Sequence, residues 1–254
     1  LSSNIKCGNS LIDSKAVAGD KAFKWEEEYP YIFEKGGFDV VIGNPPYGVN
    51  LSNLEIEYFR KKFSSIIGHA EIYYLFIELA LNGILGKEKN LSYIIPNAWL
   101  SNKYAFGVRK LILKNFKPIE IINFNQKVIF EDAQVETCIL SIKKTPGFES
   151  IIVGHDLNLK YTFNPKCWFK DNNLIINFSE NAEIQSILEK VNGNPIRLEE
   201  LLDISNGCKP YQAGYGTNLE GKALTKEDVK NRIYHSKTKL SDQYFSELKG
   251  KHIQ

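Results

Sequence analysis

The alternation of apolar and polar residues divides the first 147 residues into strands and helices. Apolar, β-branched runs bounded by turn residues predict strands at 38–43, 91–95, 119–124 and 135–143. Helical spacing predicts helices from a capping box at Ser52 to about residue 63, over 70–85, and over 102–116. The run at 38–43 is typical of a buried parallel strand. This rhythm predicts a parallel α/β sheet with right-handed crossovers that ends in a hairpin across 126–133.

The pattern changes after Gly147, which divides the chain into three segments. Residues 1–147 carry the strand and helix alternation, and residues 148–194 have shorter strand-like pieces and one helix over about 180–191. Residues 195–254 begin another, mixed α+β module, which we expect to be truncated.

Composition excludes several classes of protein. The chain of 254 residues is 43% hydrophobic with a formal charge of +2, so it is globular, and any nucleic-acid site is a local patch. The longest apolar runs are too short to span a membrane. The four cysteines are scattered without metal-ligand spacing, which predicts free thiols, a reducing cytoplasm and no metal site. The chain begins with Leu and contains no Met, which favours an internal piece of a longer protein.

The residues with the clearest chemistry follow the strand at 38–43: Asn44, Pro45, Pro46 and Tyr47. Prolines fix the backbone and add carbonyls without N–H groups, so the Asn44 side-chain oxygen and the Pro45 carbonyl can both accept hydrogen bonds from one amine. Tyr47 offers a flat face for the planar group that bears this amine. The alternative is a rigid strand-to-helix turn with a packed Tyr. Open α/β sheets place ligands at this end of the strands.

The segment FDVVIGNPPYG resembles the catalytic signature of the S-adenosylmethionine-dependent DNA methyltransferases that methylate amino groups, in their adenine-N6 branch. The likeness extends to IKCGNSLI (5–12), AEIYYLFIELAL (70–81) and LSYIIPNAWL (91–100), and LEELLDISNGCKPYQAGYG (198–216) resembles the start of a target-recognition domain in restriction-modification members. The resemblance implies the C-terminal half of a Rossmann-like class I methyltransferase sheet in 1–147, then a bridging segment, and then the start of the target-recognition domain.

Two further site residues rest on the same resemblance. IFEDAQVETCILSIKK (129–144) is similar to the late motif whose aromatic residue packs on a flipped base, so Phe130 and Tyr47 are expected to sandwich the base, although Phe130 fits a core position equally well. Asn9 stands where the family usually has an acidic cofactor residue, and an amide can pair with the edge of the cofactor adenine. An ordinary turn Asn is the alternative. Residues 1–12 are expected to form a strand and its turn.

The family's glycine-rich cofactor loop, which precedes this region, has no counterpart in the chain. We therefore expect the chain alone to bind S-adenosylmethionine weakly, and we expect an N-terminal part of the same protein to be a partner. The predicted function is methyl transfer from S-adenosylmethionine to adenine N6 in double-stranded DNA, through Asn44 to Tyr47, with Asn9 and Asn44 at the cofactor. The alternatives are a protein-glutamine methyltransferase, against which the 207 residues after Tyr47 argue, and a non-catalytic DNA-binding module.

Overall fold

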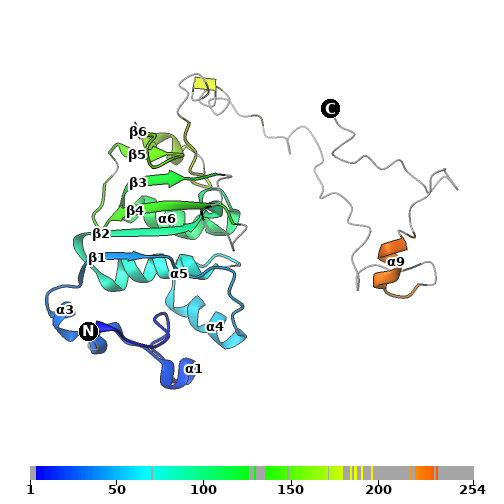
Figure 1. The fold of residues 1–254 in the computed structure, drawn as a ribbon, viewed down its shortest axis with the longest axis horizontal. Coiled ribbons are helices and arrows are strands. Elements are labelled where there is room, and N and C mark those ends of the chain that lie inside the picture. The colour runs from blue at the N-terminus through cyan, green and yellow to red at the C-terminus, as the bar shows by residue number, and fades with distance from the viewer. Residues whose placement is uncertain are drawn as a thin grey trace. The chain divides into compact units, whose positions relative to one another are not determined.

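The computed structural model describes residues 4–69, 71–125, 129, 135–147, 149–170, 172–179 and 221–231, with isolated residues at 184, 186, 187, 190, 196, 218 and 233. In this part of the chain, six strands form one sheet in the order β1-β2-β4-β3-β5-β6 (Figure 1). The strands are β1 (Phe38–Gly43), β2 (Leu85–Pro96), β3 (Lys117–Asn123), β4 (Thr137–Lys143), β5 (Ile151–Gly154) and β6 (Lys160–Phe163).

Helices connect these strands and cover the sheet. The α-helices are α1 (Lys15–Ala18), α2 (Trp25–Glu28), α3 (Pro30–Glu34), α4 (Asn53–Lys62), α5 (Ile72–Leu79), α6 (Phe106–Asn115) and α9 (Lys226–Asn231). A π-helical turn, η3 (Ala80–Ile84), continues α5 to the start of β2. Short 3-10 turns are η2 (Gly19–Lys21), η4 (Asn97–Leu100), η5 (Lys103–Ala105) and η6 (Pro165–Phe169). The predicted helices at 52–63, 70–85 and 102–116 are therefore confirmed with small changes at their ends.

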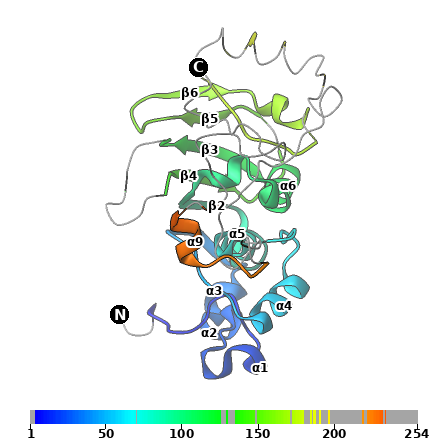
Figure 2. The same ribbon diagram turned by 90° about the vertical axis from the view of Figure 1, so that its right-hand side faces the viewer.

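The direction of the strands confirms the predicted α/β class. Strands β1 and β2 are parallel, as expected for two strands joined through the helices α4 and α5. Strand β4 returns antiparallel to both of its neighbours, β2 and β3, and thus forms the expected hairpin with β3. Helices α5 and α6 pack against each other and against the sheet (Figure 2). The sheet is therefore mixed: the β1–β2 and β3–β5 pairs are parallel, and the pairs that β4 and β6 make are antiparallel.

Strands β5 and β6 lie in the segment that was expected to bridge two domains. β5 pairs parallel with β3, and β6 pairs antiparallel with β5, so this segment extends the same sheet. The predicted helix over 180–191 lies almost entirely outside the described residues. The chain divides into two compact units, Leu1–Asn194 and Pro195–Gln254, and α9 is the described element of the second. The proposed domain limits at 147 and 194 stay predictions.

Two hydrophobic cores stabilise the first unit. The larger core lies between the sheet and the helices α5 and α6 and contains Tyr73, Trp99 and Leu140. The smaller core joins Leu11 and Ile12 to α4 and α5 on the β1 side of the sheet (Figure 1). Burying such side chains is worth about 1.5–3 kcal/mol each, so the smaller core helps to hold the segment before α1 in place.

Two expectations for this side of the molecule are wrong. Residues 4–12 form no strand; within the part of the chain that the structure describes, their one ladder contact is an isolated parallel bridge between Asn9 and Ala22. Turn-forming Gly, Asn and Ser interrupt the apolar pattern there, and the backbone instead turns so that the Ile12 N–H is bonded to Asn9. In addition, β1 is an edge strand in the described part of the chain, with Val40 51% and Ile42 78% exposed, and is not buried on both sides.

Candidate active site

The four motif residues form a rigid loop directly beyond the carboxyl end of β1. Asn44 and Pro46 are exposed, Pro45 is buried, and Tyr47 is half-buried and packs against the larger core. The end of β1 can pass close to β2 at this point because Gly43 has no side chain. A Cβ at this position would lie only 3.1 Å from the Tyr93 ring of β2. The packing therefore places Asn44 at the surface and anchors the loop through its neighbours Pro45 and Tyr47.

The Asn44 side chain is available for a ligand. Among the described residues it makes no hydrogen bond, and the Pro45 carbonyl also accepts none. The two prolines lack N–H groups that could compete for these oxygens. Two hydrogen-bond acceptors thus stand next to each other on a fixed backbone, which is the arrangement needed to hold one amino group from both of its N–H bonds.

A pocket of about 410 Å³ adjoins this loop and runs along β1. Its walls are mainly apolar, with Trp25 and Phe38 at the β1 edge and Phe76 and Leu79 from α5. The polar lining residues are Ser10, Asn44 and Tyr93. Burial raises the pKa of the Tyr93 hydroxyl to about 12, so this group stays protonated at neutral pH. Apolar walls with a few polar groups suit a flat heterocycle such as the adenine of an adenosyl group.

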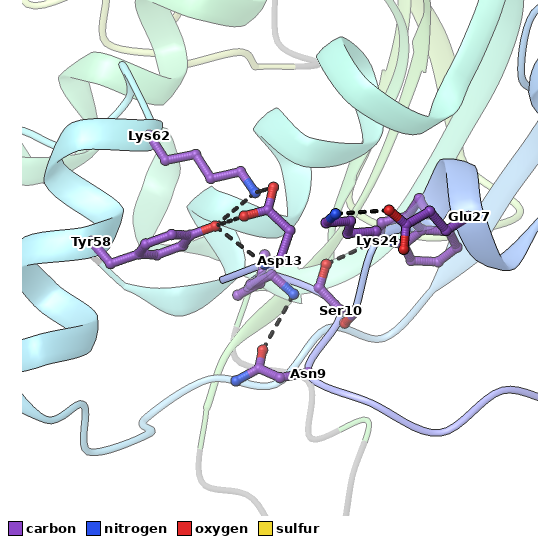
Figure 3. Close-up of polar contacts among 9 residues, drawn as sticks. Asn9, Ser10, Asp13, Lys24, Glu27, Tyr58 and Lys62 are labelled. Carbon is purple, nitrogen blue, oxygen red and sulfur yellow. Dashed lines mark hydrogen bonds and ion pairs between the residues drawn. The ribbon is translucent and has the colours of Figure 1, made fainter. Parts of the chain in front are cut away.

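Asn9 does not line this pocket, although its neighbour Ser10 does. Its side-chain oxygen accepts a hydrogen bond of 3.3 Å from the Leu11 N–H, as in an Asx turn (Figure 3). Its neighbour Ser10 lines the pocket, and the Ser10 carbonyl accepts a hydrogen bond of 3.0 Å from Trp25 Nε1. Asn9 therefore forms an ordinary turn, which was the alternative to a cofactor contact. The amide nitrogen of Asn9 has no partner among the described residues, so it can still meet a ligand.

Sequence analysis did not identify three residues near the turn of Asn9 and Ser10, namely Asp13, Tyr58 and Lys62. Asp13 bonds both Tyr58 and Lys62 of α4, with 2.7 Å between Lys62 Nζ and Asp13 Oδ2 (Figure 3). Burial raises the pKa of Asp13, but the hydrogen bonds from Lys62 and Tyr58 outweigh it and leave the pKa below its usual value. Burial lowers the pKa of Lys62, but the hydrogen bonds to Asp13 and Tyr58 outweigh burial and leave this pKa above its usual value. Pattern analysis has no signal for a contact across 45 residues.

A second group of polar side chains lies where β2 and β3 end and β4 begins. Asn97, after β2, donates hydrogen bonds of 3.0 Å to Asn123 at the end of β3 and to Glu136 before β4. The sequence analysis did not single these residues out. Phe130, the proposed second face of the base sandwich, lies outside the described residues, so its pairing with Tyr47 stays a prediction.

Other observations limit the chemistry of the described part of the chain. No group of three or more His, Cys, Asp or Glu residues that could hold a metal ion occurs among the described residues. Cys7 and Cys138 are free thiols. No described helix is long and apolar enough to cross a membrane.

Comparison with known proteins gives the family. The profile of the Eco57I restriction-modification methylase family matches residues 1–130. The chain is 32% identical over 152 residues to the type II restriction enzyme and methyltransferase RM.Eco57I of Escherichia coli. This alignment covers 57% of this chain and 15% of that protein. It is 28% identical over 260 residues to the putative type II restriction enzyme and methyltransferase RM.MjaORFECS2P of Methanocaldococcus jannaschii, with coverages of 88% and 21%.

Among solved structures, the chain resembles a nuclease-deletion mutant of the Type ISP restriction-modification enzyme LlaGI in complex with a DNA substrate mimic. The TM-score is 0.44 at 15% identity, over 63% of this chain and 20% of that one. The chain thus spans about a fifth or less of the length of the curated relatives named above. Because the family profile spans half of this sequence, including the loop from Asn44 to Tyr47, the chain belongs to the Eco57I restriction-modification methylase family.

Proposed function

We propose that this chain carries the catalytic loop of an S-adenosylmethionine-dependent DNA methyltransferase that methylates the N6 amine of adenine, within a restriction-modification protein. The carrying observation is the pair of unoccupied acceptors, the Asn44 side chain and the Pro45 carbonyl, beside an apolar pocket at the carboxyl end of a strand. The family membership and the names of the relatives support a methyltransferase, while the adenine specificity rests on the motif.

The residues of this chain have separable roles in such a reaction. Asn44 and Pro45 accept hydrogen bonds from the target amine and direct its lone pair, and the Tyr47 ring stacks on the base. A base inside a duplex cannot reach this loop, so the target must leave the stack. S-adenosylmethionine, when bound, supplies a methyl group on a positively charged sulfur. Asn9 and Ser10 fit the edge of its adenine, because Ser10 lines the pocket and the amide nitrogen of its neighbour Asn9 has no partner among the described residues.

Direct transfer needs no covalent intermediate on the protein. Asn44 and Pro45 would hold the target amine with its lone pair toward the methyl group that S-adenosylmethionine would supply, and the proton that the nitrogen loses on methylation would pass to solvent. The Asn44 and Pro45 oxygens stabilise the partial positive charge that develops on this nitrogen, since both are hydrogen-bond acceptors with negative partial charge. Positioning and charge placement are thus the contributions of this loop.

The test is to identify the methylated product. The intact protein is incubated with methyl-labelled S-adenosylmethionine and plasmid DNA, and the DNA is digested to nucleosides and separated. We expect label in N6-methyladenine. Label in N4-methylcytosine would contradict the adenine specificity, and label in protein glutamine would support a protein-glutamine methyltransferase. DNA binding without any transfer would support the non-catalytic module.

A further inference from the structure

A network of three side chains connects two parts of the site that are far apart in the sequence. Asp13 follows the loop that contains Asn9 and Ser10, whereas Tyr58 and Lys62 lie one turn apart on α4, which follows the catalytic loop. Figure 3 shows Tyr58 and Lys62 directed from α4 toward Asp13. The network therefore links the cofactor side of the proposed site to the helix that begins after its catalytic side.

The Tyr58 hydroxyl is the centre of this network. It donates a hydrogen bond of 2.5 Å to Asp13 Oδ1 and accepts bonds from the Asp13 backbone N–H at 3.2 Å and from Lys62 Nζ at 2.9 Å. Lys62 closes the triangle with its bond of 2.7 Å to Asp13 Oδ2. Because the backbone of Asp13 is bonded as well as its side chain, the network fixes the position of the chain itself at this residue.

Helix α4 begins shortly after the catalytic loop. Four residues separate Tyr47 from Ser52, the N-cap of α4. Ser52 and Glu55 form a complete capping box, with Ser52 N–H bonded to Glu55 Oε2 at 2.9 Å, so the start of the helix is defined. Leu51 packs on the smaller core together with Leu11. A displacement of α4 relative to Asp13 would therefore change the distance between the two halves of the site.

We propose that Asp13, Tyr58 and Lys62 are positioning residues that set the separation between the loop of Asn9 and Ser10 and the loop of Asn44 to Tyr47. This inference rests on the proposed function, because it gives the network its role in aligning cofactor and target amine. Methyl transfer in line requires the two reacting groups at a defined distance and angle, so a loosened loop at Asn9 weakens cofactor binding and lowers the rate without affecting the DNA surface.

The test compares Asp13→Asn, Lys62→Gln and Tyr58→Phe in the intact protein. The Tyr58→Phe change keeps the ring, which packs on the smaller core, and removes only the hydroxyl. The matched control is Glu27→Gln, which breaks the exposed bond of 2.7 Å between Lys24 and Glu27 in the same region. That bond spans three residues and connects nothing to α4, so its loss is expected to leave both KM values unchanged.

We expect the three variants to raise KM for S-adenosylmethionine about three- to tenfold and to lower kcat, while KM for DNA stays within twofold of wild type. A merely structural role would reduce the folded fraction, which lowers kcat and moves neither KM. An unchanged cofactor KM in all three variants would overturn the proposal. The double variant Asp13→Asn with Lys62→Gln should lose no more than the worse single variant, since both act through one network.

Equilibrium binding separates this inference from the proposed function. Calorimetry of S-adenosylmethionine with the wild type and the variants needs no turnover. If the wild type methylates no DNA, the proposed function fails, yet a three- to tenfold weaker cofactor Kd in the three variants would still support the positioning role. An equal Kd in wild type, variants and the Glu27→Gln control would contradict it whatever the activity.

Discussion

The catalytic loop and the cofactor-side segment are held in place by different means. Residues 44–47 owe their shape to two prolines at the end of a strand, and the Asn44 side chain has no hydrogen-bond partner among the described residues. Residues 9–13 have no regular structure and depend on bonds from distant residues, such as Trp25 to Ser10 and Tyr58 to Asp13. The conformation of the first loop depends mainly on its own residues, whereas that of the second depends on contacts with residues distant in the sequence.

This difference separates the effects of mutation in the two regions. A change at Asn44 acts on the ligand directly, because the Asn44 side chain makes no hydrogen bond among the described residues and so does not hold the loop. A change around residues 9–13 acts on position, because most side chains there are already engaged within the protein. The following predictions test this separation.

The largest effect is expected from Asn44→Ala. This change removes a hydrogen-bond acceptor for the target amine and leaves Pro45 and Tyr47 to hold the loop. Loss of one such group costs about 100- to 1,000-fold in kcat. Labelled methyl transfer measures the rate, and fluorescence anisotropy should give an unchanged Kd for DNA. The exposed Asn50→Ala is the control and should retain activity. Transfer by Asn44→Ala near the wild-type rate would show that the loop is only structural.

A smaller effect is expected at Tyr47. Stacking of a base on an aromatic ring is worth roughly 1–3 kcal/mol, so Tyr47→Ala should lose about 5- to 150-fold in kcat/KM for DNA. Tyr47→Phe keeps the ring and should stay within about twofold of wild type. Because Tyr47 also packs on the larger core, thermal unfolding must accompany the kinetics. Equal losses in both variants would mean that the hydroxyl, and not the ring, is the functional group.

The same difference explains what the sequence could predict. The bounds of β1 and the capping box at Ser52 agree with the structure, because both depend on neighbouring residues. The motif loop was likewise located from its own four residues. The structure also places it beside Ser10, 34 residues earlier in the chain, which the predicted strand at 1–12 did not suggest.

Features that depend on distant partners were missed. Strand β2 begins at Leu85, six residues before the predicted start, because the polar residues 87–90 are paired in space: Glu88 N–H bonds the Lys144 carbonyl at 3.0 Å, and Lys144 N–H bonds that of Lys89 at 2.8 Å. No apolar period marks such pairing. The bonds of Asp13 with α4 and of Asn97 with Glu136 escaped for the same reason.

The smallest expected effect is a pH dependence confined to the cofactor side. The pKa of Asp13 is below its unfolded value of about 3.9, since its bonds to Lys62 and Tyr58 outweigh burial. A depressed carboxyl pKa contributes stability that is complete above the unfolded pKa and is lost as the pH falls through the folded pKa. The Asp13 and Lys62 side chains are 47% and 31% exposed, so solvent screening limits this contribution to below about 1 kcal/mol.

Urea unfolding of wild type and Asp13→Asn at several pH values measures this contribution. We expect the wild type to be more stable at pH 7, and the difference to shrink as the pH falls from about 5 to 3, because a protonated Asp13 resembles Asn. Hydrogen exchange should show the loosening at the Asp13 N–H, which is bonded to Tyr58, and not at Tyr47 or Gly48 of the catalytic loop. Equal loosening of both regions would contradict the view that the two loops are stabilised independently. It would show instead that they unfold as one cooperative unit.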